Sequence, residues 1–214
     1  MANYKSNLAT STPVCHMAGG GLKMAATMKE NAREAIMLAA REAAMARGYG
    51  GINFRDIAAT VGIKAASINY YFANKALLGE AVARRYWEDI SRDLHAISAN
   101  ADTPLNALRQ YPGVFRASLA RDNRICLSSF MAAEFDELPE PVLKEVQAFA
   151  DVNVAWLSRE LVAAKVVGPD ESEGRARAIY AAVAGAQIVA RSRSNIALFD
   201  TLIESYRSAG LLPA

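Results

Sequence analysis

The sequence predicts an all-α protein, on three observations. Apolar residues recur three or four positions apart through most of the 214 residues, and no stretch alternates apolar and polar residues as a half-buried strand does. Proline or glycine interrupts the pattern at Thr103-Pro104, Leu138-Pro139 and Gly168-Pro169, where helices are expected to end. Apolar residues make up 52% of the chain, enough for a core without disulfides or a structural metal.

The composition also excludes several protein classes. No apolar run approaches the roughly 18 to 20 residues of a membrane span, and the N-terminus lacks the apolar stretch of a secretion signal. We therefore expect a cytoplasmic protein with no membrane partner. Two cysteines, Cys15 and Cys126, are too few for a disulfide framework, so each is expected to be a reduced thiol.

The N-terminal part of the chain changes character near residue 25. Residues 1–25 contain Ser, Thr, Asn, Pro and three consecutive glycines without helical periodicity, which predicts a flexible tail. From Met28 to Arg47 apolar residues return at helical spacing, and Gly48 follows as a stop signal. This pattern predicts a helix of about 20 residues.

Two short helices follow, joined by a glycine. Asn53 can cap the first, which is expected to end at Gly62, and Lys64–Tyr71 form the second. Ile68 and Phe72 stand four residues apart, so both can pack back onto the first short helix. Two short helices joined by a tight glycine turn predict a helix-turn-helix.

Longer helices are expected beyond Asn74. Their predicted limits are Lys75 to about Ser98, Pro104 to about Ala120, Cys126–Glu137, Pro139–Val167, Asp170–Ser194 and Ile196–Ser208. The chain thus divides into a three-helix unit at residues 26–75 and a larger helical unit at residues 76–214.

The charge is distributed unevenly between these two units. Residues 23–75 hold eight bases against four acids, a net charge of +4, whereas residues 76–214 hold 15 bases against 18 acids, a net charge of −3. The smaller unit is therefore the candidate for binding a polyanion.

The stretch SINYYFANK (67–75) places three aromatic residues in a row beside an asparagine and a lysine. In a helix-turn-helix the second helix lies in the DNA major groove, where tyrosine and lysine donate to phosphates and asparagine pairs with adenine. We expect contacts to the backbone of double-stranded DNA from Tyr70, Tyr71 and Lys75. The candidates for base recognition are Lys64, Ser67 and Asn69. The small residues that let the backbone approach DNA are Ala65 and Ala66. The alternative is that the aromatic side chains only fill space between helices, which we adopt for Phe72 and leave open for Tyr70 and Tyr71.

Residues 47–78 combine several further signals in a fixed order. They read RGYGGINFRDIAATVGIKAASINYYFANKALL, with a glycine-tyrosine pair, a polar cap, an Ile-Ala pair, a turn glycine, a helix ending Y-x-F and an Asn-Lys pair. In this order and spacing the segment resembles the DNA-binding domain of TetR-family transcriptional regulators. The resemblance implies backbone contacts from Asn53, Tyr70, Tyr71 and Lys75, and base reading by residues 64–69. Lys64 replaces the usual Ser or Thr cap and Asn69 an often aromatic residue, so relatives do not predict the operator sequence.

The resemblance also implies what residues 76–214 do. In this family a larger helical domain binds a small-molecule effector and forms a homodimer. The resemblance therefore implies a repressor that binds a pseudo-palindromic operator and is released from it when the effector binds. Large side chains that could line an effector pocket are Trp87, Phe115, Cys126, Phe130, Phe149 and Trp156. The alternative is that most of these side chains are simply core.

A small-residue face in the last two helices is the candidate for the dimer seam. The run AAVAGA (181–186) allows close helix packing, and the family's dimers use the corresponding helices. The expected seam residues are Ala182, Gly185, Ala186, Leu198 and Leu202. Burial of this face inside one subunit is the alternative.

Other functions find less support in the sequence. The two histidines, His16 and His95, have neither metal-ligand spacing nor a neighbouring nucleophile, so we expect no catalytic site, metal or cofactor. A helical adaptor that binds only protein leaves the basic unit unexplained. Cys126 opens a predicted helix near Arg121 and Arg124, which favours a reactive thiolate, whereas its apolar neighbours favour an inert buried thiol.

Overall fold

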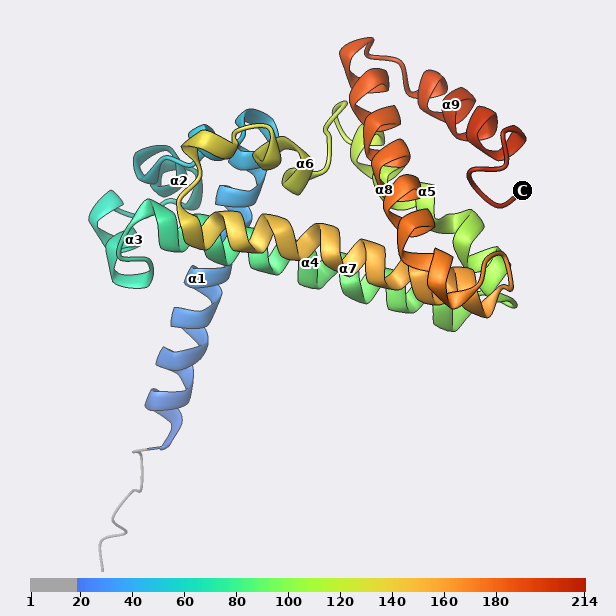
Figure 1. The fold of residues 1–214 in the computed structure, drawn as a ribbon. Helices are drawn as coiled ribbons and strands as arrows, with labels where there is room; N and C mark the ends of the chain where they lie inside the picture. The colour runs from blue at the N-terminus through green and yellow to red at the C-terminus, as the bar shows by residue number, and fades with distance from the viewer. Residues whose placement is uncertain (1–18) are drawn as a thin grey trace, which may run out of the picture. The chain divides into compact units, whose positions relative to one another are not determined.

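The computed structural model describes the backbone of residues 19–214 and the side chains from residue 29 onward. This part of the chain forms helices and no strands, which confirms the all-α prediction (Figure 1). The helices are α1 (Gly19–Arg47), α2 (Phe54–Val61), α3 (Ala65–Tyr71), α4 (Lys75–Asn100), α5 (Pro104–Ala120), α6 (Leu127–Ala132), α7 (Glu140–Ala163), α8 (Pro169–Ser192) and α9 (Ile196–Ser208). Two single turns of 3₁₀ helix, η1 (Tyr49–Gly51) and η2 (Phe135–Glu137), complete the described part.

Residues 35–214 form one compact unit, and all contacts described below lie within it. The first helix starts earlier than expected, because α1 begins at Gly19 and includes residues 19–25 of the predicted tail. The rest of that tail, with Cys15 and His16, lies outside the described residues.

The helix-turn-helix forms through the local signals that predicted it. Asn53 Oδ1 accepts hydrogen bonds from the backbone N–H groups of Arg55 (2.8 Å) and Asp56 (3.3 Å), so it caps α2 as expected. Gly62 ends α2 in the left-handed conformation (φ 76°) that favours glycine. Ile68 and Phe72 are buried as predicted, which fixes the side of α3 that faces the domain.

Two boundaries in the larger domain differ from the prediction. The expected helix 126–137 is wrong, because α6 ends at Ala132 and the chain continues through Glu134 into η2. The expected helix 139–167 ends at Ala163, because Lys165 adopts a left-handed conformation (φ 57°). The N–H of Val166 then bonds to the Leu161 carbonyl at 3.0 Å, a common way to terminate a helix.

The larger domain is built on α4 and α7, which run side by side, with α8 packed against α7 and α9 (Figure 1). Its interior holds a cluster of rings from α4, α5 and α7. Tyr111 stacks on Trp156 with ring centroids 5.7 Å apart, and Tyr86 stacks on Phe149 at 5.6 Å. Aromatic side chains therefore fill the space between these helices.

None of the described helices combines the length and the apolar character that a membrane crossing requires.

Candidate DNA-binding surface and effector site

Helix α3 has one buried side and one exposed side. Ile68 is fully buried, whereas the Tyr70 side chain, two residues on, is 68% exposed. Five further residues expected to face DNA are also accessible: Lys64, Ala65, Ala66 and Asn69 are exposed and Ser67 is half-buried. The structure thus gathers the expected base-reading residues on the outward side of one short helix.

The expected phosphate contacts are less uniform. The rings of Tyr70 and Tyr71 meet edge to face, with centroids 5.2 Å apart, and Tyr71 is half-buried. The capping role of Asn53 occupies its carbonyl oxygen, which leaves its amide nitrogen to donate to a phosphate. Lys75 is half-buried, and its ammonium nitrogen lies 4.3 Å from the centroid of the Tyr49 ring. Lys75 is therefore held by an aromatic face that the sequence analysis did not anticipate.

Comparison with known proteins places this geometry in a family. Residues 36–82 match the family model described as bacterial regulatory proteins, tetR family. A solved TetR-family transcriptional regulator from Agrobacterium tumefaciens is 26% identical, covers 84% of this chain and 97% of its own, and superposes with a TM-score of 0.78. Residues 36–82 therefore form a TetR-family DNA-binding domain, and the chain as a whole has the fold of a TetR-family transcriptional regulator.

Other solved structures share this fold. A TetR transcriptional regulator from Legionella pneumophila is 24% identical over 83% of this chain and 96% of its own, with a TM-score of 0.77. The reduced form of NemR from E. coli is 18% identical over 83% of this chain and 96% of its own, with a TM-score of 0.72. No curated protein sequence matches the chain.

The side chains expected to line an effector pocket fall into two groups. Phe115, Cys126, Phe149 and Trp156 are each at most 2% exposed and belong to the core. The other two lie elsewhere: Trp87 donates to Glu145 Oε2 at 2.7 Å, and Phe130 lies under the Arg191 guanidinium. The core members therefore pack against other side chains of the interior.

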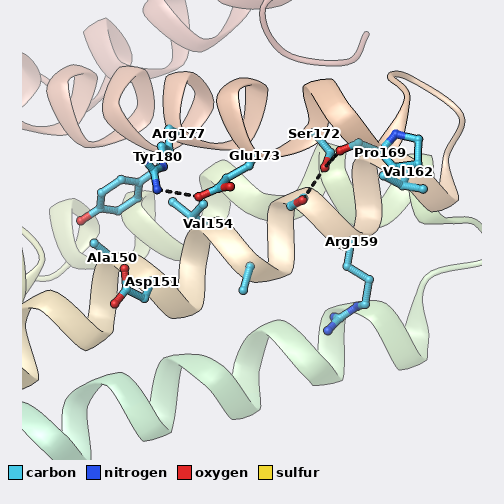
Figure 2. Close-up of a pocket in the computed structure, with 12 residues that line it drawn as sticks. Ala150, Asp151, Val154, Arg159, Val162, Pro169, Ser172, Glu173, Arg177 and Tyr180 are labelled. Carbon is cyan, nitrogen blue, oxygen red and sulfur yellow. Dashed lines mark hydrogen bonds and ion pairs between the residues drawn. The ribbon is translucent and has the colours of Figure 1, made fainter.

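A groove of about 880 Å³ lies between α7 and α8, and none of the six expected side chains lines it (Figure 2). Its apolar lining includes Val154 and Val162, and its polar lining includes Asp151. Tyr180 connects this groove to the core, because its ring centroid lies 6.3 Å from those of both Phe115 and Phe149. Burial raises the pKa of the Tyr180 hydroxyl, so this group stays protonated and can donate a hydrogen bond.

Cys126 is 2% exposed, at the start of α6. Its backbone N–H donates to Gln187 Oε1 at 3.0 Å, and Gln187 Nε2 donates to the Phe115 carbonyl at 2.5 Å. Burial raises the pKa of the Cys126 thiol, while hydrogen bonds from Ser129 and Tyr86 act in the opposite direction. Of the two alternatives for Cys126, this environment therefore favours the neutral buried thiol over the reactive thiolate. No group of three metal-ligating side chains occurs within the described residues.

The expected dimer seam is mostly accessible. Ala182, Gly185, Leu198 and Leu202 are half-buried, whereas Ala186 is fully buried within the chain and faces the core. The outward side of α8 also carries Ile188 and Val189, whose side chains are 49% and 46% exposed. A Cβ added at Gly185 would meet no atom within 4 Å. For Ala186 the alternative of burial inside one subunit holds.

Proposed function

We propose that this protein is a cytoplasmic repressor that binds a pseudo-palindromic operator as a homodimer and is released by a small-molecule effector. The observation that carries this proposal is the outward side of α3, where Lys64, Asn69 and Tyr70 stand exposed on a helix whose opposite side is buried. A surface of small, amide and phenolic side chains suits base edges and phosphates in the major groove.

The residue roles follow from exposure and chemistry. Lys64, Ser67 and Asn69 read bases, and Ala65 and Ala66 let the backbone approach. Asn53, Tyr70, Tyr71 and Lys75 contact the phosphate backbone, which sets the register of the helix on the duplex.

The outward side of α8 supports the dimer. Gly174, Ala178, Ala181, Gly185 and Ile188 follow one another at intervals of three or four residues, and all five are exposed or half-buried. A helix with small residues along one side lets a second helix approach closely. A two-fold dimer then imposes two-fold symmetry on its DNA site.

The effector site is proposed at the α7/α8 groove and the aromatic core beneath it. Tyr180 lies between the two and can take part in both. The groove has the volume of a site for a drug-sized molecule, and apolar walls with few polar groups are typical of such sites.

The test is selection of a preferred site from random double-stranded DNA, followed by gel-shift titration at two salt concentrations. We expect a pseudo-palindromic site. Asn69→Ala should change the preferred bases, while Asn100→Ala, at an exposed position of α4, should leave them unchanged. Absence of DNA binding at both salt concentrations would favour the protein-binding adaptor instead.

A further inference from the structure

Glu134 connects two parts of the chain that lie far apart in sequence. Its Oε2 accepts a hydrogen bond from the backbone N–H of Tyr49 at 2.6 Å, across 85 residues. Tyr49 opens the turn η1 between α1 and α2, in the DNA-binding domain, whereas Glu134 lies between α6 and η2, in the larger domain. In Figure 1 the yellow segment that follows α6 passes beside this turn.

The backbone at the turn is shaped to receive the Glu134 carboxylate. Gly48 has a φ of 70°, a conformation that favours glycine, and a Cβ at this residue would overlap the carboxylate. A side chain at residue 48 would therefore strain the backbone and displace the Glu134 carboxylate. A hydrogen bond from a backbone N–H to an ionised carboxylate is also stronger than one between neutral groups.

The η1 turn also carries the Tyr49 ring, and this ring contacts Lys75. A Cβ added at Gly79 of α4 would lie 2.7 Å from Tyr49 Cε2 and 3.1 Å from Val142 Cγ2, so the ring is tightly packed at this point. The Lys75 ammonium nitrogen lies over the same ring, 4.3 Å from its centroid. The position of Lys75, a proposed phosphate contact, therefore depends on the position of the Tyr49 turn.

We propose that Glu134 is a positioning residue for operator recognition. Its carboxylate fixes the Tyr49 turn to the segment after α6, and so sets the placement of α2, α3 and Lys75 against the larger domain. This inference rests on the proposed function, because only a dimer that reads two half-sites needs both DNA-binding domains at a defined separation.

The test compares Glu134→Ala with Glu137→Ala, which removes the same charge three residues away from an exposed side chain. Loss of an acid near DNA strengthens DNA binding electrostatically, so Glu137→Ala should bind the selected operator as well as, or slightly better than, wild type. Glu134→Ala should bind it about tenfold more weakly, the order expected when a hydrogen bond to a charged group is lost. Glu134→Gln keeps one acceptor oxygen and should recover part of this loss.

Two readouts separate positioning from simple stabilisation. Affinity for random DNA should fall by less than operator affinity in Glu134→Ala, at a temperature well below its unfolding midpoint, because binding to random DNA does not need both domains at a defined separation. If Glu134 merely stabilised the fold, the ratio of operator to random-DNA affinity would be unchanged at that temperature, and the proposal would be overturned. Amide exchange of Tyr49 gives a readout without DNA: it should be slow in wild type and fast in Glu134→Ala.

The outcomes also separate this inference from the proposed function. A wild-type protein that prefers no DNA site would contradict the proposed repressor. The amide exchange rate of Tyr49 alone would then test the positioning role of Glu134. Equal Tyr49 protection in wild type and Glu134→Ala would overturn the positioning role even if the operator is found.

Should Glu134→Ala not fold, a double-mutant cycle of Gly48→Ala with Glu134→Gln replaces it. The new methyl group of Gly48→Ala displaces the side chain at residue 134, and the charged carboxylate has the stronger hydrogen bond to lose. Gly48→Ala should therefore lower the unfolding midpoint more in the wild-type background than in the Glu134→Gln background. Equal effects in the two backgrounds would overturn the contact.

Discussion

Replacing Gln187 by leucine tests how the larger domain fixes the start of α6. Gln187 is fully buried, accepts from the Cys126 N–H at 3.0 Å and donates to the Phe115 carbonyl at 2.5 Å. Leucine has a similar size but no polar atoms, so the substitution leaves the Cys126 N–H buried without this acceptor. The Phe115 carbonyl lies within α5 and can keep its helical partner.

The expected cost is therefore that of one unsatisfied buried donor, about 1 to 3 kcal/mol. For a domain of this size each kcal/mol shifts the unfolding midpoint by about 2 to 4 °C, so Gln187→Leu should unfold about 2 to 12 °C below wild type. Thermal unfolding followed by circular dichroism measures this shift. All samples need the same protein concentration, because dimerisation stabilises the folded state.

The matched control is Gln147→Leu, which makes the same chemical change at an exposed position of α7. Its midpoint should stay within about 1 °C of wild type, since surface substitutions usually change stability by less than about 0.5 kcal/mol. Equal midpoints for Gln187→Leu and Gln147→Leu would refute the reasoning that the Gln187 contact holds α6.

Four further predictions concern DNA, the dimer, the buried thiol and the pH dependence of stability. Lys75→Ala should weaken binding to all DNA sequences and reduce the magnitude of the salt slope by about one, whereas Lys144→Ala should change neither in gel-shift titrations. Ala182→Glu should give monomers in sedimentation and lose operator affinity, and a dimeric variant would contradict the α8 seam. Cys126 should react with iodoacetamide at least about 1,000-fold more slowly than a free cysteine at neutral pH, because the buried thiol is accessible only in the small fraction of molecules that are unfolded. Rapid alkylation would show that the thiol is accessible in the folded protein. The raised pKa values of Cys126 and Tyr180 mean that the folded state holds these protons more tightly than the unfolded state. The contribution of these two protonated groups to the free energy of unfolding is therefore complete below their unfolded pKa values and is lost as pH rises. The unfolding midpoint should accordingly fall above about pH 8.5, the pKa of an unfolded cysteine. A midpoint that rises in this range would contradict the reasoning.

The sequence predicts most reliably the structural features that depend on residues close together in the chain. The Asn53 cap and the Gly62 turn each depend on a few adjacent residues, and the structure forms both where the pattern places them. The buried side of α3 follows from helical spacing, since Ile68 and Phe72 stand one turn apart. These local features are enough to predict which side of α3 is exposed.

The contacts that fix α6 carry no such local signal. Glu134 meets Tyr49 across 85 residues, and Gln187 meets Cys126 across 61. Apolar periodicity continues past Ala132, so the pattern alone favours one helix where the structure has α6 and η2. The pocket could not be predicted for a related reason: ring count indicates a large apolar interior but does not show whether rings fill it or leave space.

The segment 126–134, which contains α6, connects α8 of the larger domain to the Tyr49 turn of the DNA-binding domain. The segment starts at Cys126, which Gln187 of α8 fixes, and continues to Glu134, which holds the Tyr49 turn. Gln187 lies on the buried side of α8, while Gly185 and Ile188 lie on the side proposed to meet the partner subunit. One helix would then carry both the dimer contact and the anchor of α6. Because these two roles use different sides of α8, substitutions at Ile188 should alter dimerisation while the Cys126 contact stays intact, and substitutions at Gln187 should do the reverse.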